Sequence, residues 1–164
     1  MQPPSPPVPA LEALPSAAPS VQRLTFIHGE ERRVLIGMLR HDRDSLRLAL
    51  LSPQGQRLLT LVRDQEGIRF LPGAAFEPPF TAEWLASRLS WSLWPAEHLR
   101  DAFDGSDWTL EATGNERWIR HRGRLVAQLV GGPECRIIHD LEGGYRLAIT
   151  AADHDRAEAP CRVP

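Results

Sequence analysis

Apolar and polar residues alternate along two stretches of the chain, from Val21 to Leu71 and from Asp107 to Ala151. This alternation is typical of β-strands, whose successive side chains point to opposite faces of a sheet. Turn residues interrupt it repeatedly, as in Ser52-Pro53-Gln54-Gly55, so the pattern predicts antiparallel meanders. The predicted strands are Val21–His28, Arg32–His41, Ser45–Ser52, Gln56–Arg63, Ile68–Leu71, Asp107–Thr113, Arg117–Arg122, Leu125–Val130, Cys135–Asp140 and Tyr145–Ala151.

A helical pattern separates the two strand-rich stretches and covers Phe80–Phe103. Thr81 is a suitable N-cap, and Leu85 and Leu89 lie one turn apart on a common helix face. Pro95 ends this helix and suits the first turn of a second one, where its missing N–H is not needed. We therefore expect two short helices within a mainly β protein.

About ten strands are more than a flat sheet usually carries without curling. The sequence thus predicts a mainly β (α+β) fold, an incomplete antiparallel β-barrel of about ten strands with two or three helices covering its concave face. Some strands are apolar on both faces: in residues 34–39, Val, Ile and Met alternate with Leu, Gly and Leu. The pattern does not say which of these faces points inward.

The amino-acid composition divides the chain into three segments. Residues 1–20 contain seven prolines and predict a disordered Pro-rich leader or linker, residues 21–151 a single domain, and residues 152–164 a loose C-terminal tail. The chain of 164 residues has a net charge of -2, which gives no reason to expect a nucleic-acid partner. All 19 basic residues are arginine, and the cluster from Arg117 to Arg124 is interpreted as the solvent-facing side of a hairpin. The two cysteines, Cys135 and Cys161, either pair or remain free.

Motifs for catalysis, metal or cofactor binding are absent from the sequence, so we expect no enzyme activity, no metal and no cofactor. His98 and Asp101 have the spacing of a surface hydrogen bond on one helix. A hydrolase or thioesterase acting on acyl groups would need an activated nucleophile, and Ser87, Ser90 and Ser92 lack an evident base.

Five tryptophans are many for a chain of this length, and three of them lie in the helical segment. They are either core residues or part of the lid of a ligand cavity. If the apolar strand faces exceed what two helices can cover, an apolar cavity remains between them. The predicted lining residues of this cavity are Leu48, Leu50, Trp84, Leu85, Leu89, Trp91, Leu99, Phe103, Trp108 and Leu110.

Two segments carry a resemblance to a known family: the hairpin LRLALLSPQGQRLLTL at residues 46–61 and the helix start WPAEHLRDAF at residues 94–103. In sequence and order they resemble the LolB family of outer-membrane lipoprotein receptors, over roughly Val21 to Ala151. The chain is more similar still to an uncharacterised proteobacterial branch of LolA/LolB-like lipoproteins, some of which accompany aryl-polyene or fatty-acyl biosynthesis genes. One departure is the turn Pro53-Gln54-Gly55-Gln56, which is polar where those receptors carry a protruding hydrophobic loop; this argues against lipoprotein insertion.

The resemblance implies a non-catalytic carrier or receptor that holds a lipid, an acyl chain or the acyl chains of a lipoprotein in an apolar concavity. It implies a location at the periplasmic side of the outer membrane, through an N-terminal lipid anchor that precedes the sequence given, with a LolA-like periplasmic carrier as a further partner. The alternative is a structural or accessory scaffold of a membrane-associated acyl or polyene biosynthesis system, with a filled core.

Overall fold

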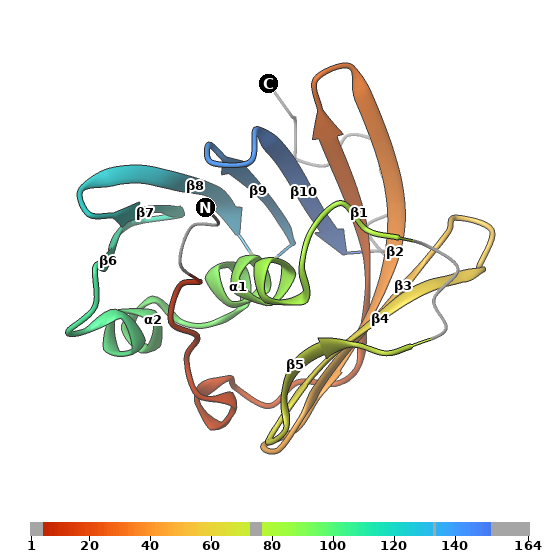
Figure 1. Ribbon diagram of the computed structural model, residues 1–164, viewed down its shortest axis with the longest axis horizontal. Helices are drawn as coiled ribbons and strands as arrows, with labels where there is room; N and C mark the ends of the chain where they lie inside the picture. The colour runs from red at the N-terminus through yellow and green to blue at the C-terminus, as the bar shows by residue number, and fades with distance from the viewer. Residues whose placement is uncertain (1–4, 73–76, 133, 152–164) are drawn as a thin grey trace.

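The computed structural model describes residues 5–72, 77–132 and 134–151, and it contains one curved antiparallel sheet (Figure 1). The strands are β1 (Ser20–His28), β2 (Glu31–His41), β3 (Leu46–Leu51), β4 (Arg57–Asp64), β5 (Gly67–Phe70), β6 (Trp108–Thr113), β7 (Glu116–His121), β8 (Arg124–Gly132), β9 (Cys135–Asp140) and β10 (Tyr145–Ala151). Their order in the sheet is β5-β4-β3-β2-β1-β10-β9-β8-β7-β6. The predicted fold class, a mainly β protein with an incomplete barrel, is confirmed.

Pairing of β1 with β10 joins the two meanders into one sheet. Both strands are central, and seven consecutive residue pairs connect them, from Gln22 with Ala151 to His28 with Tyr145. This contact links residues more than a hundred positions apart, and local alternation contains no information about it. The sheet therefore curls around a single interior, and β5 and β6 form its two edges.

Helix α1 (Ala82–Leu93) lies inside the curve of the sheet, and α2 (Ala96–Phe103) follows it toward β6 (Figure 1). The Thr81 hydroxyl accepts a hydrogen bond from the Trp84 N–H at 3.1 Å, which confirms the predicted N-cap. Pro95 caps α2 rather than occupying its first turn. Neither helix in the described parts of the chain has the length and apolar character needed to cross a bilayer.

Burial identifies the inner face of the strands that are apolar on both sides. In β2, Leu35 and Leu39 are buried, whereas Met38 is 49% exposed on the outer face. Gly37 lies on the inner face, where an added Cβ would come within 3.2 Å of a Leu48 methyl carbon and 3.3 Å of one of Leu24. The small residue at position 37 thus allows these two leucines to pack closely across the strand.

The Pro-rich segment differs from the expected disordered leader in the residues that are described. Residues 5–19 run along the open side of the sheet and include a 3₁₀ helix, η1 (Leu11–Ala13) (Figure 1). Leu11 and Leu14 pack against the core, and the Trp94 indole donates to the Ala10 carbonyl at 2.9 Å. The Arg63 guanidinium donates to the neighbouring Pro9 carbonyl. Apolar side chains between the prolines therefore have a surface to cover, which composition alone does not indicate.

Deletion of residues 1–14 should lower the free energy of unfolding by about 2 to 4 kcal/mol. The loss comes from exposing the surface that Leu11 and Leu14 cover and from removing the hydrogen bond of Trp94. Urea denaturation of the full and shortened chains measures the change. Equal stability of the two chains would show that this segment does not contribute to the folded core.

Cys135 in β9 is disulfide-bonded. Cys161, the other cysteine of the chain, and the predicted tail at residues 152–164 lie outside the described residues.

Candidate functional site

The ten residues that the sequence predicts as the lining of a cavity do share one interior. Trp84 and Leu110 are partly buried and pack against the hydrophobic core. The other eight are buried members of that core: Leu48, Leu50, Leu85, Leu89, Trp91, Leu99, Phe103 and Trp108. At these positions the interior is therefore occupied by protein side chains in contact with one another.

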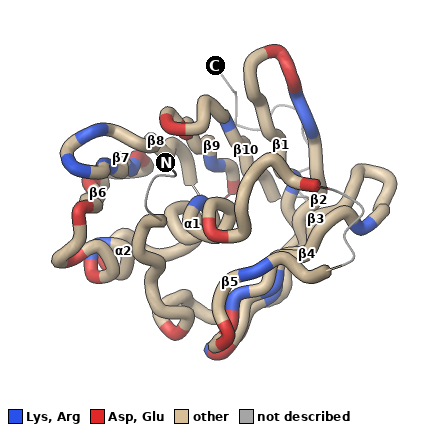
Figure 2. Tube along the Cα trace, viewed as in Figure 1, with Lys and Arg blue, Asp and Glu red and all other residues tan. Residues whose placement is uncertain are grey.

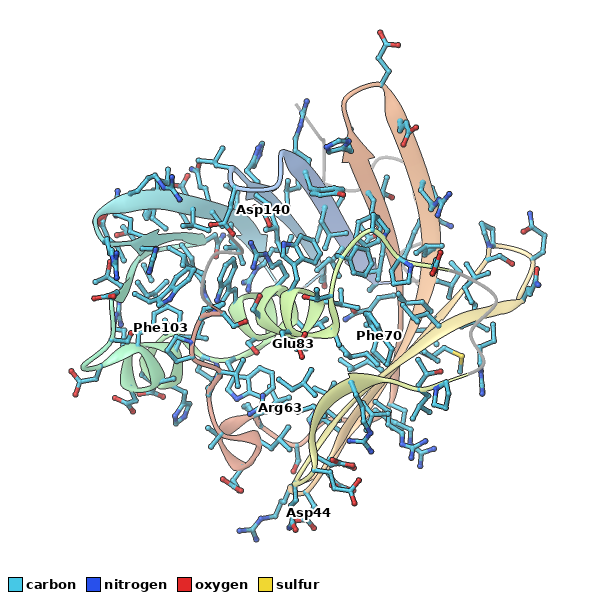
Figure 3. All side chains as sticks on the ribbon, viewed as in Figure 1. Asp44, Arg63, Phe70, Glu83, Phe103 and Asp140 are labelled. Carbon is cyan, nitrogen blue, oxygen red and sulfur yellow. The ribbon has the colours of Figure 1, made fainter. Side chains whose placement is uncertain are left out.

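The position of α1 explains why these residues form a core. The helix lies within the concavity instead of covering its mouth, and side chains occupy the space between it and the surrounding strands (Figure 3). Trp91 and Trp94 are 0% and 1% exposed. Leu11, Ala13 and Leu14 of the N-terminal segment, which was expected to be disordered, also pack against this core. Two helices and this segment together cover the apolar surface that the helices alone were expected to leave open.

A buried ion pair crosses this core. Arg88 of α1 and Asp140 of β9 are each almost fully buried, and Nη2 of the arginine lies 2.7 Å from the carboxylate. The guanidinium also lies over the rings of Trp84 and Trp91, at 4.7 and 4.3 Å from their centroids. Burial lowers the pKa of Arg88, and the carboxylate of Asp140 opposes this effect. The pair joins helix and sheet, and its burial separates it from any ligand in solution.

Two of the three serines considered as nucleophiles, Ser87 and Ser90, form hydroxyl hydrogen bonds within α1. The Ser87 hydroxyl donates to the Trp84 carbonyl at 2.7 Å, and the Ser90 hydroxyl donates to the Ala86 carbonyl at 2.9 Å. Both serines are 1% exposed. Neither is hydrogen-bonded to a histidine or carboxylate, so the arrangement lacks the base that an activated nucleophile requires.

A hollow of about 680 Å³ lies at the end of the sheet where the β1–β2 hairpin extends beyond α1. The inner faces of β1, β2 and β10 meet there with the segment that leads into α1. Its lining residues are Phe26, His28, Glu31, Arg32, Arg33, Leu35, Glu77, Pro79, Phe80 and Tyr145. None of these belongs to the cavity lining predicted from the sequence.

Aromatic rings form a continuous wall beside this hollow. Phe80 stacks with Phe26 at a centroid distance of 5.9 Å and with Trp84 at 5.1 Å. Trp84 lies 5.6 Å from Tyr145, whose ring lies 4.6 Å from that of His28. Rings in mutual contact resist reorientation, so the wall provides a preformed apolar surface.

Charged side chains surround the opening of the hollow. Figure 2 shows both signs of charge at the tip of the β1–β2 hairpin, where Glu31, Arg32 and Arg33 are exposed. Glu77 adds a carboxylate from the other side. The hollow thus combines an apolar interior with a charged rim, as expected for a site that binds an amphiphilic molecule with its polar end toward water.

The sequence did not predict this hollow, because the hollow depends on strand register and the sequence does not reveal register. Phe26 lies opposite Arg33 on one side and Leu147 on the other, and His28 lies opposite Glu31 and Tyr145. Along the inner face of the hairpin, the residues therefore change from buried and apolar to exposed and polar. The available signal was the length of the hairpin, whose strands are longer than those of most other hairpins in the chain.

In the described residues, no three His, Cys, Asp or Glu side chains gather as metal ligands would.

Comparisons with known proteins indicate the family of the chain. No curated protein matches the sequence. Residues 20–153, which include the ten strands and two α-helices of the described residues, match a family described as protein of unknown function DUF3261. The chain belongs to this family, DUF3261.

Proposed function

We propose that this protein is a non-catalytic binding protein for an amphiphilic acyl-type ligand, held in the hollow between the β1–β2 hairpin and the start of α1. The observation that carries the proposal is the aromatic wall within a hollow of about 680 Å³. Small-molecule sites commonly measure about 300 to 1,000 Å³ and combine apolar walls with a few polar groups. Removal of an acyl chain from water contributes about 0.8 kcal/mol per buried CH₂ group.

The positive charges at the rim favour a ligand whose polar end is anionic. Arg32 is exposed at the opening, and Arg33 and His28 lie near it, although Glu31 and Glu77 oppose their effect. A fatty acid or acyl phosphate would direct its anionic end to this rim and its chain toward Phe26 and Phe80. The resemblance to LolA/LolB-like lipoproteins agrees with an acyl ligand, and a location at the periplasmic side of the outer membrane rests on that resemblance alone.

The packed interior favours a second candidate function. The predicted cavity residues form a core, as expected for a scaffold with a filled interior. In that case the protein would be an accessory component of a membrane-associated acyl or polyene biosynthesis system. The two functions differ in whether the hollow binds a ligand.

Native mass spectrometry of protein purified without detergent should detect a bound acyl compound, and a fluorescent fatty acid should bind with a stoichiometry of one. The apolar wall of the hollow provides the affinity, and the charged rim orients the anionic end. A mass that matches the bare chain, together with no fatty-acid binding, would favour the scaffold.

Arg32→Glu should weaken fatty-acid binding by about threefold to tenfold, because it places a negative charge at the rim. The matched control is Arg43→Glu, which makes the same change at an exposed turn residue outside the hollow. Fluorescence titration at low ionic strength compares the two variants with the unchanged protein. Equal effects of both variants would indicate a general effect of net charge and argue against this location.

A further inference from the structure

Two arginine side chains meet at the C-terminal end of α1. Arg117 of β7 donates through Nη1 to the carbonyl oxygens of Trp91 and Trp94, both at 2.7 Å. Arg136 of β9 donates through Nη1 to the Ser92 carbonyl. The last carbonyls of a helix lack partners within the helix and carry a partial negative charge, which accounts for cations at this place.

The helix end uses only part of the hydrogen-bonding capacity of these arginines. Each guanidinium has five N–H donors. Besides the helix carbonyls, Arg136 donates through Nε to the Gly131 carbonyl at 3.2 Å, and Nη2 of either arginine forms no hydrogen bond with the described residues. Across the same described ranges, neither guanidinium forms an ion pair with a carboxylate.

Their mutual proximity is electrostatically unfavourable. Burial, and then the positive charges of Arg136 and Arg100, lower the pKa of Arg117 to about 10. Burial also lowers the pKa of Arg136. Two half-buried cations without a carboxylate between them attract an anion more strongly than exposed cations do, since water screens them less.

The two side chains line a common hollow of about 270 Å³. It lies at the opposite end of α1 from the aromatic hollow, because α1 follows Phe80 and precedes Trp94. Its lining combines two kinds of residue. The polar or small ones are Gln22, Ser92, Arg117, Gly132 and Arg136, and the apolar ones are Leu93, Trp94, Pro95 and Ile149.

We propose that this hollow binds a phosphate group between the guanidinium groups of Arg117 and Arg136. Phosphate monoesters carry nearly two negative charges at neutral pH, which matches two cations, whereas a carboxylate would neutralise one. Planar guanidinium groups recognise phosphate oxygens through paired N–H donors. The apolar residues of the lining suit the organic part of a phosphate ester. The site does not depend on the ligand proposed for the aromatic hollow.

The sequence pattern placed Arg117 on the solvent-facing side of a hairpin. In β7, however, Arg117 shares its face with Ile119, which is 0% exposed, so its side chain points into the molecule. The register of β7 with β8 shifts between Ile119 and Arg120, so Arg117 and the later arginines of the cluster do not follow one uninterrupted alternation.

Titration of the unchanged protein with inorganic phosphate, followed by NMR of arginine Nε–Hε groups, tests the site directly. The signals of Arg117 and Arg136 should shift together and reach saturation, while that of Arg43, exposed in the turn before β3, should not follow. Chloride at equal ionic strength should not reproduce the shifts. The proposal is overturned if neither signal saturates, or if Arg43 responds in the same way.

Arg136→Gln should weaken phosphate binding by at least about tenfold in isothermal titration calorimetry, since a charge-assisted contact is lost. Arg136→Lys keeps the positive charge but loses the planar pair of N–H donors, so it should retain part of the affinity. Arg43→Gln is the matched control and should bind as the unchanged protein does. Circular dichroism of each variant verifies that α1 remains folded, and unchanged affinity in a folded Arg136→Gln protein contradicts the site.

Two phosphate compounds distinguish the source of the group. If dihexanoyl phosphatidic acid binds at least about tenfold more tightly than glycerol phosphate, the phosphate is that of a lipid whose chains contact the apolar wall. Equal affinities identify a small phosphate ester. Either result supports the site, and binding of neither compound overturns it. Failure of fatty-acid binding at the aromatic hollow would leave this outcome unaffected.

Discussion

Asp140→Asn should lower the free energy of unfolding by about 3 to 5 kcal/mol, because it leaves the buried Arg88 cation with only the more distant carboxylate of Glu142, at 3.9 Å. Both side chains are almost fully buried, and the carboxylate accepts from Nε of Arg88 at 2.8 Å. Asparagine keeps the oxygen that accepts from the Gly143 N–H, so the turn after β9 retains its hydrogen bond. The change removes the charge and also the hydrogen bond from Arg88 Nε, because the amide NH₂ replaces the oxygen that accepts it. Urea denaturation followed by tryptophan fluorescence measures the loss.

A matched control is an exposed ion pair of the same sheet. Glu111→Gln removes the partner of Arg120, at 3.8 Å, where both side chains contact water. Its expected effect is below about 1 kcal/mol. Replacing both buried partners, as in Arg88→Met with Asp140→Leu, should restore part of the stability, because neither charge of the buried pair remains while the Gly143 N–H loses its acceptor. Equal losses for the buried and exposed pairs would contradict this account of the interior.

Trp91→Ala should destabilise the fold by about 3 to 5 kcal/mol, because it opens a large cavity in a close-packed core. Trp91 is 0% exposed, lies 6.1 Å from the ring of Trp108 and contacts the guanidinium of Arg88. The control is Trp118→Ala, since Trp118 is partly exposed in β7 and should lose about 1 kcal/mol or less. Thermal and urea unfolding of the two variants measure the difference. Similar effects would mean that the interior around Trp91 is not tightly packed.

The two largest effects share Arg88, so they should not be additive. Removing Trp91 exposes the guanidinium to the new cavity and weakens its coupling to Asp140. A double-mutant cycle with Trp91→Ala and Asp140→Asn should give a coupling energy of about 0.5 to 3 kcal/mol. Strict additivity would indicate that the ring and the carboxylate stabilise Arg88 independently.

Local sequence was informative wherever a feature depends on neighbouring residues. Cys135–Asp140 and Tyr145–Ala151 are strands with the predicted bounds, and the other predicted strands differ by at most two residues at an end. The N-cap at Thr81 also follows from residues within one helical turn. These features depend on alternation, turn chemistry and capping, which act over a few positions.

The candidate sites depend on contacts between distant segments. Residues 34–39 are apolar on both faces, and only the position of α1 within the concavity makes Leu35 inward and Met38 outward. The pairing of β1 with β10 brings His28 beside Tyr145, and the meeting of β7 and β9 at the end of α1 brings Arg117 near Arg136. The N-terminal segment packs because an apolar surface is available to it.

Alternation, helical spacing, capping and turn residues were thus sufficient for the strands and the helices, and the number of strands was sufficient for the expectation of a curled sheet. The interior, the aromatic hollow and the arginine pair required the folded arrangement. The physical reason is that side-chain direction along a strand follows from a period of two, whereas strand pairing, burial and the position of a helix depend on free energies summed over the whole chain.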